Sequence, residues 1–168
     1  YVQGVHFLNF KDPDLVIKKI VRSSISDLYC KGVKPKYIFI GASGNNNSFS
    51  KKNLNIISKS LKEEQKKYDL KLSGGDTTKS NKTIFTIISL GYSKKIVQRN
   101  KCNDGDDIYV TGNIGDSYLG LQILKKKLLL NKNEVNYFIN KYYLPDLPIK
   151  ISPNLVNFAS SSIDISDG

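Results

Sequence analysis

Apolar residues recur at two different spacings along the first ninety residues of the chain. Steps of three and four over 11–32 and 51–68 predict two amphipathic helices. Shorter runs rich in apolar and β-branched residues predict strands at 1–9, 36–43, 70–75 and 82–93. The predicted order is therefore β-α-β-α-β-β, which is typical of a layered α/β domain.

The residues at the helix ends support this assignment. Asp12 is a candidate N-cap with Pro13 at the first helical position, and Gly32 follows the first helix. Ser50 is a candidate N-cap for the second helix. The predicted inner face of that helix consists of Leu54, Ile57 and Leu61.

A second series of elements begins after residue 100. The pattern predicts a turn and a strand at 102–112, helices at 114–130 and 133–144, and a new strand from 161. Three prolines between 145 and 161 predict a loop around a short helix. We therefore predict an N-terminal domain over 1–111 and the beginning of a second α/β domain over 112–168. Without any Met, and with a strand-like end, the chain is expected to be an internal piece of a longer protein.

The net charge of +11 raises the question of a nucleic-acid partner. Arg22 and Arg99 are the only arginines, and the lysines are spread over the predicted helices. This distribution favours a solvated surface over a nucleic-acid footprint, and it would also attract small anionic substrates. No apolar run reaches the length of a membrane span, so no membrane partner is expected.

The acidic residues point to a particular chemistry. Twelve of the fifteen are Asp, and several adjoin Gly or Ser in predicted loops. Such positions are common in turns, but short carboxylates on loops also suit Mg²⁺, which prefers oxygen ligands. Cys30 and Cys102 lack the spacing of a zinc site and fit reduced thiols of a cytosolic protein.

Two glycine-rich stretches are candidate phosphate sites. The segment "LSGGDTTKS" (72–80) can be a plain turn, a close approach to phosphate or a metal site. The segment "GNIGDSYLG" (112–120) lacks the lysine of a Walker A loop, so it is a glycine helix entry or a position near phosphate. Neither stretch alone shows whether it binds phosphate or has only a structural role.

Five motifs taken together are more specific. "VQGVHF" (2–7), "SISDLYCKGVKP" (24–35), "LSGGDTT" (72–78), "GDDIYVTGNIGDSYLGL" (105–121) with Arg99 before it, and "IDISDG" (163–168) occur in this order. Their order and intervals resemble the thiamine-monophosphate kinases, members of the aminoimidazole-ribonucleotide synthetase-like ATP-binding superfamily. The resemblance implies an α/β fold in which a mixed sheet is packed with helices.

The resemblance also implies a role for individual residues. His6, which alone would be assigned a structural role, would contact thiamine monophosphate. Asp27, Asp76, Asp164 and Asp167 would ligate Mg²⁺, and Gly75, Asp76, Arg99 and Ser166 would contact ATP. No residue is predicted to act as a catalytic base, because the acceptor phosphate is already largely ionised at neutral pH.

The implied reaction is direct transfer of the γ-phosphoryl group from ATP to thiamine monophosphate, with several Mg²⁺ ions and no phospho-enzyme. The resemblance further implies a cytoplasmic homodimer formed through the sheet of the first domain. The sequence departs from the family pattern at two places: Gln3 stands where the family often has Glu, and "YCKG" (29–32) replaces "AAMG". Asp27, the metal ligand of the second motif, is retained. Two ligand segments of the family would precede Tyr1 and much of the thiamine pocket would follow Gly168, so activity is expected of the complete protein.

Two alternatives stay open. A relative within the superfamily would use ATP on a formylglycinamidine, selenide or carbamoyl substrate. A basic nucleic-acid-binding module without catalysis would explain the charge, but it would leave the Asp-glycine loops without a role.

Overall fold

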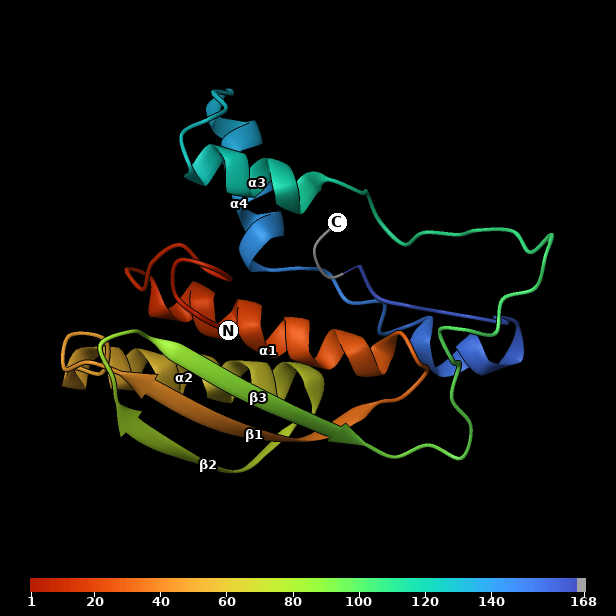
Figure 1. The fold of residues 1–168 in the computed structure, drawn as a ribbon, viewed down its shortest axis with the longest axis horizontal. Coiled ribbons are helices and arrows are strands. Elements are labelled where there is room, and N and C mark those ends of the chain that lie inside the picture. The colour runs from red at the N-terminus through yellow and green to blue at the C-terminus, as the bar shows by residue number, and fades with distance from the viewer. Residues whose placement is uncertain (166–168) are drawn as a thin grey trace. The chain divides into compact units, whose positions relative to one another are not determined.

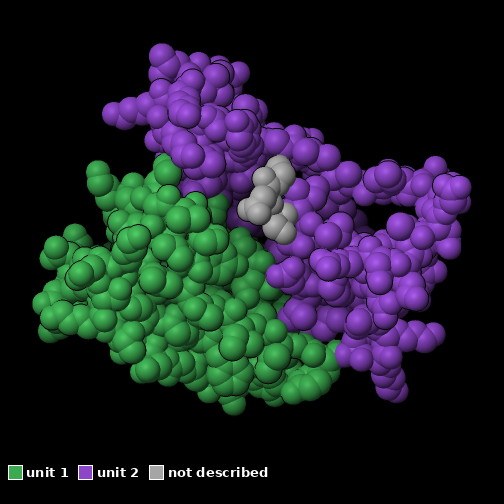
Figure 2. All heavy atoms as spheres, in the orientation of Figure 1, with its two compact units in different colours: residues 1–25, 35–92 green, residues 26–34, 93–168 purple. Residues whose placement is uncertain are grey.

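The computed structural model describes residues 1–165, which fall into two compact units (Figures 1 and 2). Unit 1 comprises Tyr1–Ile25 and Pro35–Tyr92, and unit 2 comprises Ser26–Lys34 together with the residues from Ser93 onward. None of the helices in the described range has both the length and the apolarity that crossing a membrane requires. The predicted domain boundary after residue 111 stays a prediction.

Unit 1 is built on a three-stranded mixed sheet. Its strands are β1 (Pro35–Gly44), β2 (Lys71–Lys79) and β3 (Ile84–Gly91), in the order β2-β1-β3. β2 runs parallel to β1, and β3 runs antiparallel to it. The helices α1 (Pro13–Tyr29) and α2 (Lys51–Tyr68) lie along one side of this sheet (Figure 1). The prediction of a mixed sheet packed with helices is confirmed.

The core of unit 1 lies between the sheet and the helices. Along β1, Ile38 is fully buried whereas its neighbour Phe39 is 37% exposed, as the alternation of a half-covered strand requires. Phe85 of β3 and Ile17 of α1 are also buried. The opposite face of the sheet therefore carries apolar side chains that helices do not cover.

The predicted helix starts are confirmed. The Asp12 side chain accepts a hydrogen bond from the Leu15 backbone N–H at 3.2 Å, and α1 begins at Pro13. Ser50 accepts from the Asn53 N–H at 3.4 Å at the start of α2. Each side chain satisfies a backbone donor that has no partner within its helix.

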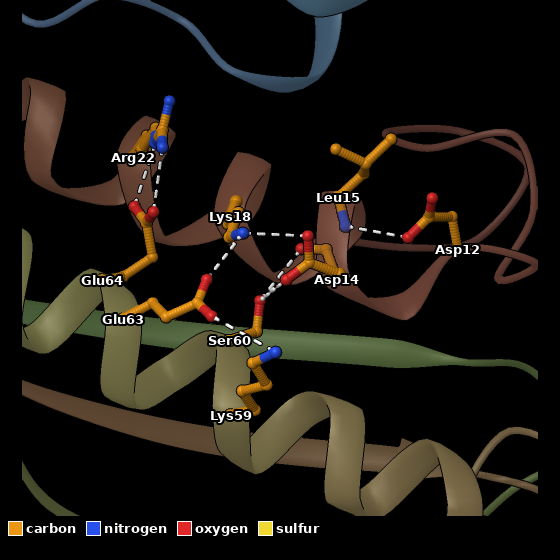
Figure 3. A network of polar contacts seen from close by, with 9 residues as sticks. All are labelled: Asp12, Asp14, Leu15, Lys18, Arg22, Lys59, Ser60, Glu63 and Glu64. Carbon is orange, nitrogen blue, oxygen red and sulfur yellow. Dashed lines mark hydrogen bonds and ion pairs between the residues drawn. The ribbon is translucent and has the colours of Figure 1, made fainter.

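The contact between α1 and α2 is polar (Figure 3). Arg22 donates two hydrogen bonds of 2.9 Å to the buried Glu64 carboxylate, and Lys18 pairs with Asp14 and Glu63. The predicted inner face of α2 was therefore wrong at one end. Its buried residues are Ser60, Glu64 and Tyr68, and Leu54 is 45% exposed. Apolar periodicity could not find this face because polar partners on α1 make its burial possible.

Ser60 links the two helices through Asp14. Its hydroxyl is fully buried and donates to the Asp14 carboxylate at 2.7 Å and to the Asp14 carbonyl at 3.1 Å. Burial raises the pKa of Asp14, but hydrogen bonds from Lys18 and Ser60 outweigh it and hold that pKa below its usual value.

Replacing Ser60 by Ala is expected to lower the free energy of unfolding by about 1 to 2 kcal/mol at pH 7, because a bond to a charged acceptor is lost. A group with a depressed folded-state pKa contributes stability that disappears as pH falls through that pKa. The difference between the variant and the wild type should therefore shrink below the ordinary Asp value of 3.8. Urea unfolding at pH 7 and at pH 3 measures it; a difference that grows in acid would contradict this account.

Two predictions for unit 1 need correction. Residues 1–9 form two isolated bridges, Val2 with Ile84 and Gln3 with Phe7, around a turn and not a continuous strand. The third strand does not stop at residue 75, because β2 continues to Lys79. "LSGGDTTKS" is therefore strand for most of its length and not a plain turn.

Unit 2 contains α3 (Asp116–Leu124), α4 (Lys132–Tyr143) and the short helix η1 (Ser152–Asn157). α3 and α4 pack closely, since a side chain at Gly120 would meet the Phe138 carbonyl at 2.2 Å. The helix predicted at 133–144 and the short helix between 145 and 161 are confirmed.

Two strand predictions for unit 2 were wrong, and the helix predicted at 114–130 was right except for its length. Residues 102–112 form no strand, and reciprocal hydrogen bonds between Asn103 and Asp106 replace strand pairing with a local turn. The helix predicted to 130 ends at Leu124, and Lys126 has a left-handed φ of 57°. Residues 161–165 are not strand either, and 166–168 lie outside the described range.

Candidate metal and nucleotide site

Unit 2 brings together two of the predicted metal ligands. Asp27 lies in the last turns of α1, within the part of that helix that belongs to unit 2. Asp164 lies 137 positions further along, and its side chain shares a hydrogen bond with the Asp27 side chain. A hydrogen bond between two carboxyl groups requires a proton on one of them, and a bound cation can take the place of that proton between two carboxylates.

The electrostatics of this carboxyl pair favour a bound positive charge. Burial raises the pKa of Asp27, and the nearby Asp164 carboxylate raises it further by repulsion and through their hydrogen bond. Lys31 acts in the opposite direction on Asp27. The pair therefore holds negative charge at a cost, which a cation between the two carboxylates would offset.

Two residues that the sequence prediction did not include, Cys30 and Lys31, lie near this carboxyl pair. The Cys30 sulfur accepts a hydrogen bond from the Asp164 backbone, and burial raises the pKa of the Cys30 thiol. Lys31 supplies the positive charge that acts on Asp27. Both residues follow directly after the end of α1, close to Asp27 in the sequence, and this closeness is the only signal that the sequence offers.

The second group of predicted residues lies on β2 in unit 1. Asp76 is exposed, and its carboxylate accepts a hydrogen bond of 2.8 Å from the Thr77 N–H. Gly75 pairs with Ile40 of β1 so closely that a Cβ atom would lie 2.0 Å from the Ile40 carbonyl oxygen. Glycine is thus required at 75 by strand pairing, a reason that the motif does not reveal.

The predicted substrate residue His6 also belongs to unit 1. It lies in the exposed turn between the two isolated bridges, where its Nδ1 accepts a hydrogen bond of 3.0 Å from the Val2 N–H. Its ring meets the Tyr1 ring edge-on at 5.7 Å. The Nδ1 bond orients the imidazole and leaves Nε2 as the nitrogen that points away from this contact.

The remaining predicted residues of the site are Arg99, Ser166 and Asp167. Arg99 is exposed in an irregular segment of unit 2. Ser166 and Asp167 lie outside the described residues. Over residues 1–165, no three His, Cys, Asp or Glu side chains gather closely enough to form a metal site. The carboxyl pair of Asp27 and Asp164 is therefore the part of the predicted site that the structure assembles.

Curated relatives match the chain along its whole length. It is 37% identical to the thiamine-monophosphate kinase of Buchnera aphidicola (subspecies Schizaphis graminum), over 99% of this chain and 52% of the relative. The corresponding enzyme of Haemophilus influenzae is 35% identical over 99% of this chain and 51% of its own length. The chain thus spans about half the length of the curated relatives it matches.

Solved structures give the same result for the fold. The thiamine monophosphate kinase of Aquifex aeolicus superposes with a TM-score of 0.91 at 26% identity, over 100% of this chain and 57% of that one. A structure of AaThiL complexed with AMPPCP and TMP gives the same TM-score and identity over 99% of this chain and 54% of that one. Residues 1–92 match the family described as "AIR synthase related protein, N-terminal domain". Because this match covers more than half of the chain, the chain belongs to the AIR synthase related protein family.

Proposed function

We propose that the protein containing this chain is a thiamine-monophosphate kinase, which transfers the γ-phosphoryl group of ATP to thiamine monophosphate and yields thiamine diphosphate. The observation that carries the proposal is the match along the whole chain to AaThiL, which has been solved with both the ATP analogue AMPPCP and TMP. The curated relatives with this activity share the same extent of similarity.

The carboxyl pair of Asp27 and Asp164 fits the Mg²⁺ ions that the proposal includes. Carboxylate oxygens are hard ligands of the kind that Mg²⁺ binds, and their mutual repulsion favours a cation. Asp76 and Asp167 would also ligate Mg²⁺. When bound, Mg²⁺ would neutralise and align the phosphate groups of the two substrates.

The residues of the chain bind and position the substrates in this proposal. Arg99 would hold ATP phosphates through its planar guanidinium, and Ser166 would bind the nucleotide. His6, oriented by the Val2 N–H, would contact thiamine monophosphate. No side chain needs to remove a proton from the acceptor, whose phosphate is largely ionised at pH 7. The transfer would be in line, without a phospho-enzyme.

The reaction is tested with the complete natural protein, ATP and Mg²⁺. Thiamine monophosphate is expected to stimulate ADP release, whereas formylglycinamidine, selenide and carbamoyl substrates are expected to have no effect. Stimulation by one of these other substrates instead would favour another ATPase of the superfamily. Removal of Mg²⁺ with EDTA should abolish the release of ADP.

A homodimer through the sheet of unit 1 is part of the proposal, with the cytoplasm as its location. The face of the sheet that α1 and α2 leave uncovered carries exposed apolar side chains, and register places Phe39 beside Ile88. Ile88 is 55% exposed, and Leu90 and Tyr92 continue the same row along β3 and beyond it. An apolar patch of this kind is typical of a protein–protein interface.

Replacing Ile88 by Asp is expected to convert the dimer to a monomer, because an unpaired charge would be buried in the interface. Light scattering coupled to size-exclusion chromatography measures the mass. Leu54→Asp is the matched control, since Leu54 is exposed on α2 and away from this face. A dimeric Ile88 variant would contradict the proposed interface.

A further inference from the structure

A hollow in unit 1 has no role in the proposed reaction. It has a volume of about 530 Å³ and is formed by three segments, 3–11, 45–53 and 81–82, all within unit 1. Sites for small molecules usually have volumes of about 300 to 1,000 Å³. None of the residues predicted to bind ATP, Mg²⁺ or thiamine monophosphate lines it.

The lining of this hollow is unusually rich in amides. Six of its residues are Asn or Gln, two are lysines, and none is acidic: Gln3, Asn9, Asn45, Asn47, Asn53, Asn81, Lys11 and Lys82. Leu8 and the buried Phe10 supply apolar surface. A ligand in this hollow would thus meet amide groups, positive charge and an apolar patch together.

Part of the amide set builds a fixed wall. Asn45 Oδ1 accepts hydrogen bonds from the N–H groups of Asn47 and Ser48, at 3.0 and 2.9 Å. Asn53 donates from its side-chain nitrogen to the carbonyl oxygens of the same two residues, at 3.0 and 3.2 Å. The loop after β1 is therefore held in place from both sides without any ligand, which reduces the entropy lost on binding.

Other polar groups in the hollow face solvent. Among the residues that the structure describes, the side chains of Gln3, Asn47 and Asn81 make no hydrogen bond with the protein. The ammonium groups of Lys11 and Lys82 likewise form no ion pair within the described range. These five groups are available to a ligand.

We propose that this hollow binds a phosphorylated sugar. A side-chain amide both donates and accepts, as a sugar hydroxyl does, so several amides suit a polyhydroxyl compound. The two lysines, with no acid in the lining, suit its phosphate group. Leu8 and Phe10 suit the apolar C–H face of a sugar ring. His6 belongs to the same segment as Gln3 and Leu8 but does not line the hollow, and the proposed ligand is not a substrate of the transfer.

The test uses the complete natural protein and glucose 6-phosphate as the probe, with glucose and inorganic phosphate titrated alongside. Glucose 6-phosphate is expected to bind more tightly than either part alone, as measured by calorimetry and by ligand-observed NMR. The double variant Asn81→Ala/Lys82→Ala should weaken binding at least about tenfold, because it loses an amide and a charged hydrogen-bond donor.

The matched control is Asn55→Ala/Lys62→Ala, which removes the same residue types from the exposed surface of α2 and should bind like the wild type. Equal weakening by the control would show a general charge effect and overturn the proposal. No binding at millimolar concentration, or equally tight binding of inorganic phosphate, would also overturn it. AMP binding that is tighter than that of glucose 6-phosphate and is weakened by Asn81→Ala/Lys82→Ala would overturn the choice of a sugar. Kinase activity, measured in parallel, reports separately on the proposed function.

Discussion

Replacing Asp27 by Asn in the complete protein is expected to lower turnover at least about 10²-fold, because an electrostatic group that holds a metal is lost. The same magnitude is expected for Asp76→Asn. In the metal-free protein, the Asp27 variant should be at least as stable as the wild type. Its amide still forms hydrogen bonds, and the repulsion from Asp164 that helps raise the pKa of Asp27 is gone.

These opposite effects distinguish a metal site from a structural contact. Steady-state kinetics at saturating Mg²⁺ measures the first effect, and thermal unfolding in EDTA measures the second. Asp104→Asn is the control, because Asp104 is exposed in the loop before Gly105. Near-normal turnover of the Asp27 variant would exclude this residue from the proposed site. A loss of both turnover and thermal stability in EDTA would assign it a structural role.

Replacing Gly75 by Ala is expected to lower the free energy of unfolding by about 3 kcal/mol or more. The added Cβ would lie 2.0 Å from the Ile40 carbonyl oxygen, and a backbone atom cannot move aside as a flexible side chain can. β2 would have to separate from β1 at the position next to Asp76. Urea unfolding without nucleotide measures this loss independently of ATP binding.

Gly41→Ala is the matched control for this change. Gly41 lies on β1 one position after Ile40, and a Cβ there would make an ordinary contact of 3.8 Å with the Thr86 Cβ. This variant is expected to be within about 1 kcal/mol of the wild type, because Ala is compatible with an extended backbone. An equal loss of unfolding free energy in the two variants would show that the clash with the Ile40 carbonyl is not the cause of the destabilisation.

The helix starts of unit 1 could be predicted because they depend on residues that are close together in the sequence. Asp12, Pro13 and Ser50 mark the helix starts because capping depends on local geometry. The inner face of α2 could not be predicted, since Ser60 and Glu64 are buried only because Asp14 and Arg22 on another helix pair with them. Burial of this kind depends on a tertiary contact between positions more than forty residues apart.

The residues of the candidate site were proposed from the sequence motifs and not from the hydrophobic periodicity. Nothing in the periodicity brings Asp27 and Asp164 together; the motif resemblance did, and the structure shows their side chains hydrogen-bonded. The segment "LSGGDTTKS" alone could be a turn, a close approach to phosphate or a metal site. Gly75 lies within a strand against Ile40, and its contact with ATP stays a prediction. Glycine is compatible with all of these roles, so only the position of the neighbouring strand distinguishes them.

The central claim is that the protein transfers a phosphoryl group from ATP to thiamine monophosphate, and the fate of the γ-phosphorus tests it most directly. The complete natural protein is incubated with Mg²⁺, thiamine monophosphate and ATP labelled at the γ-phosphate, and the products are separated. The account predicts that the label appears in thiamine diphosphate, in step with ADP. Label found only in inorganic phosphate, with no thiamine diphosphate formed, would contradict it.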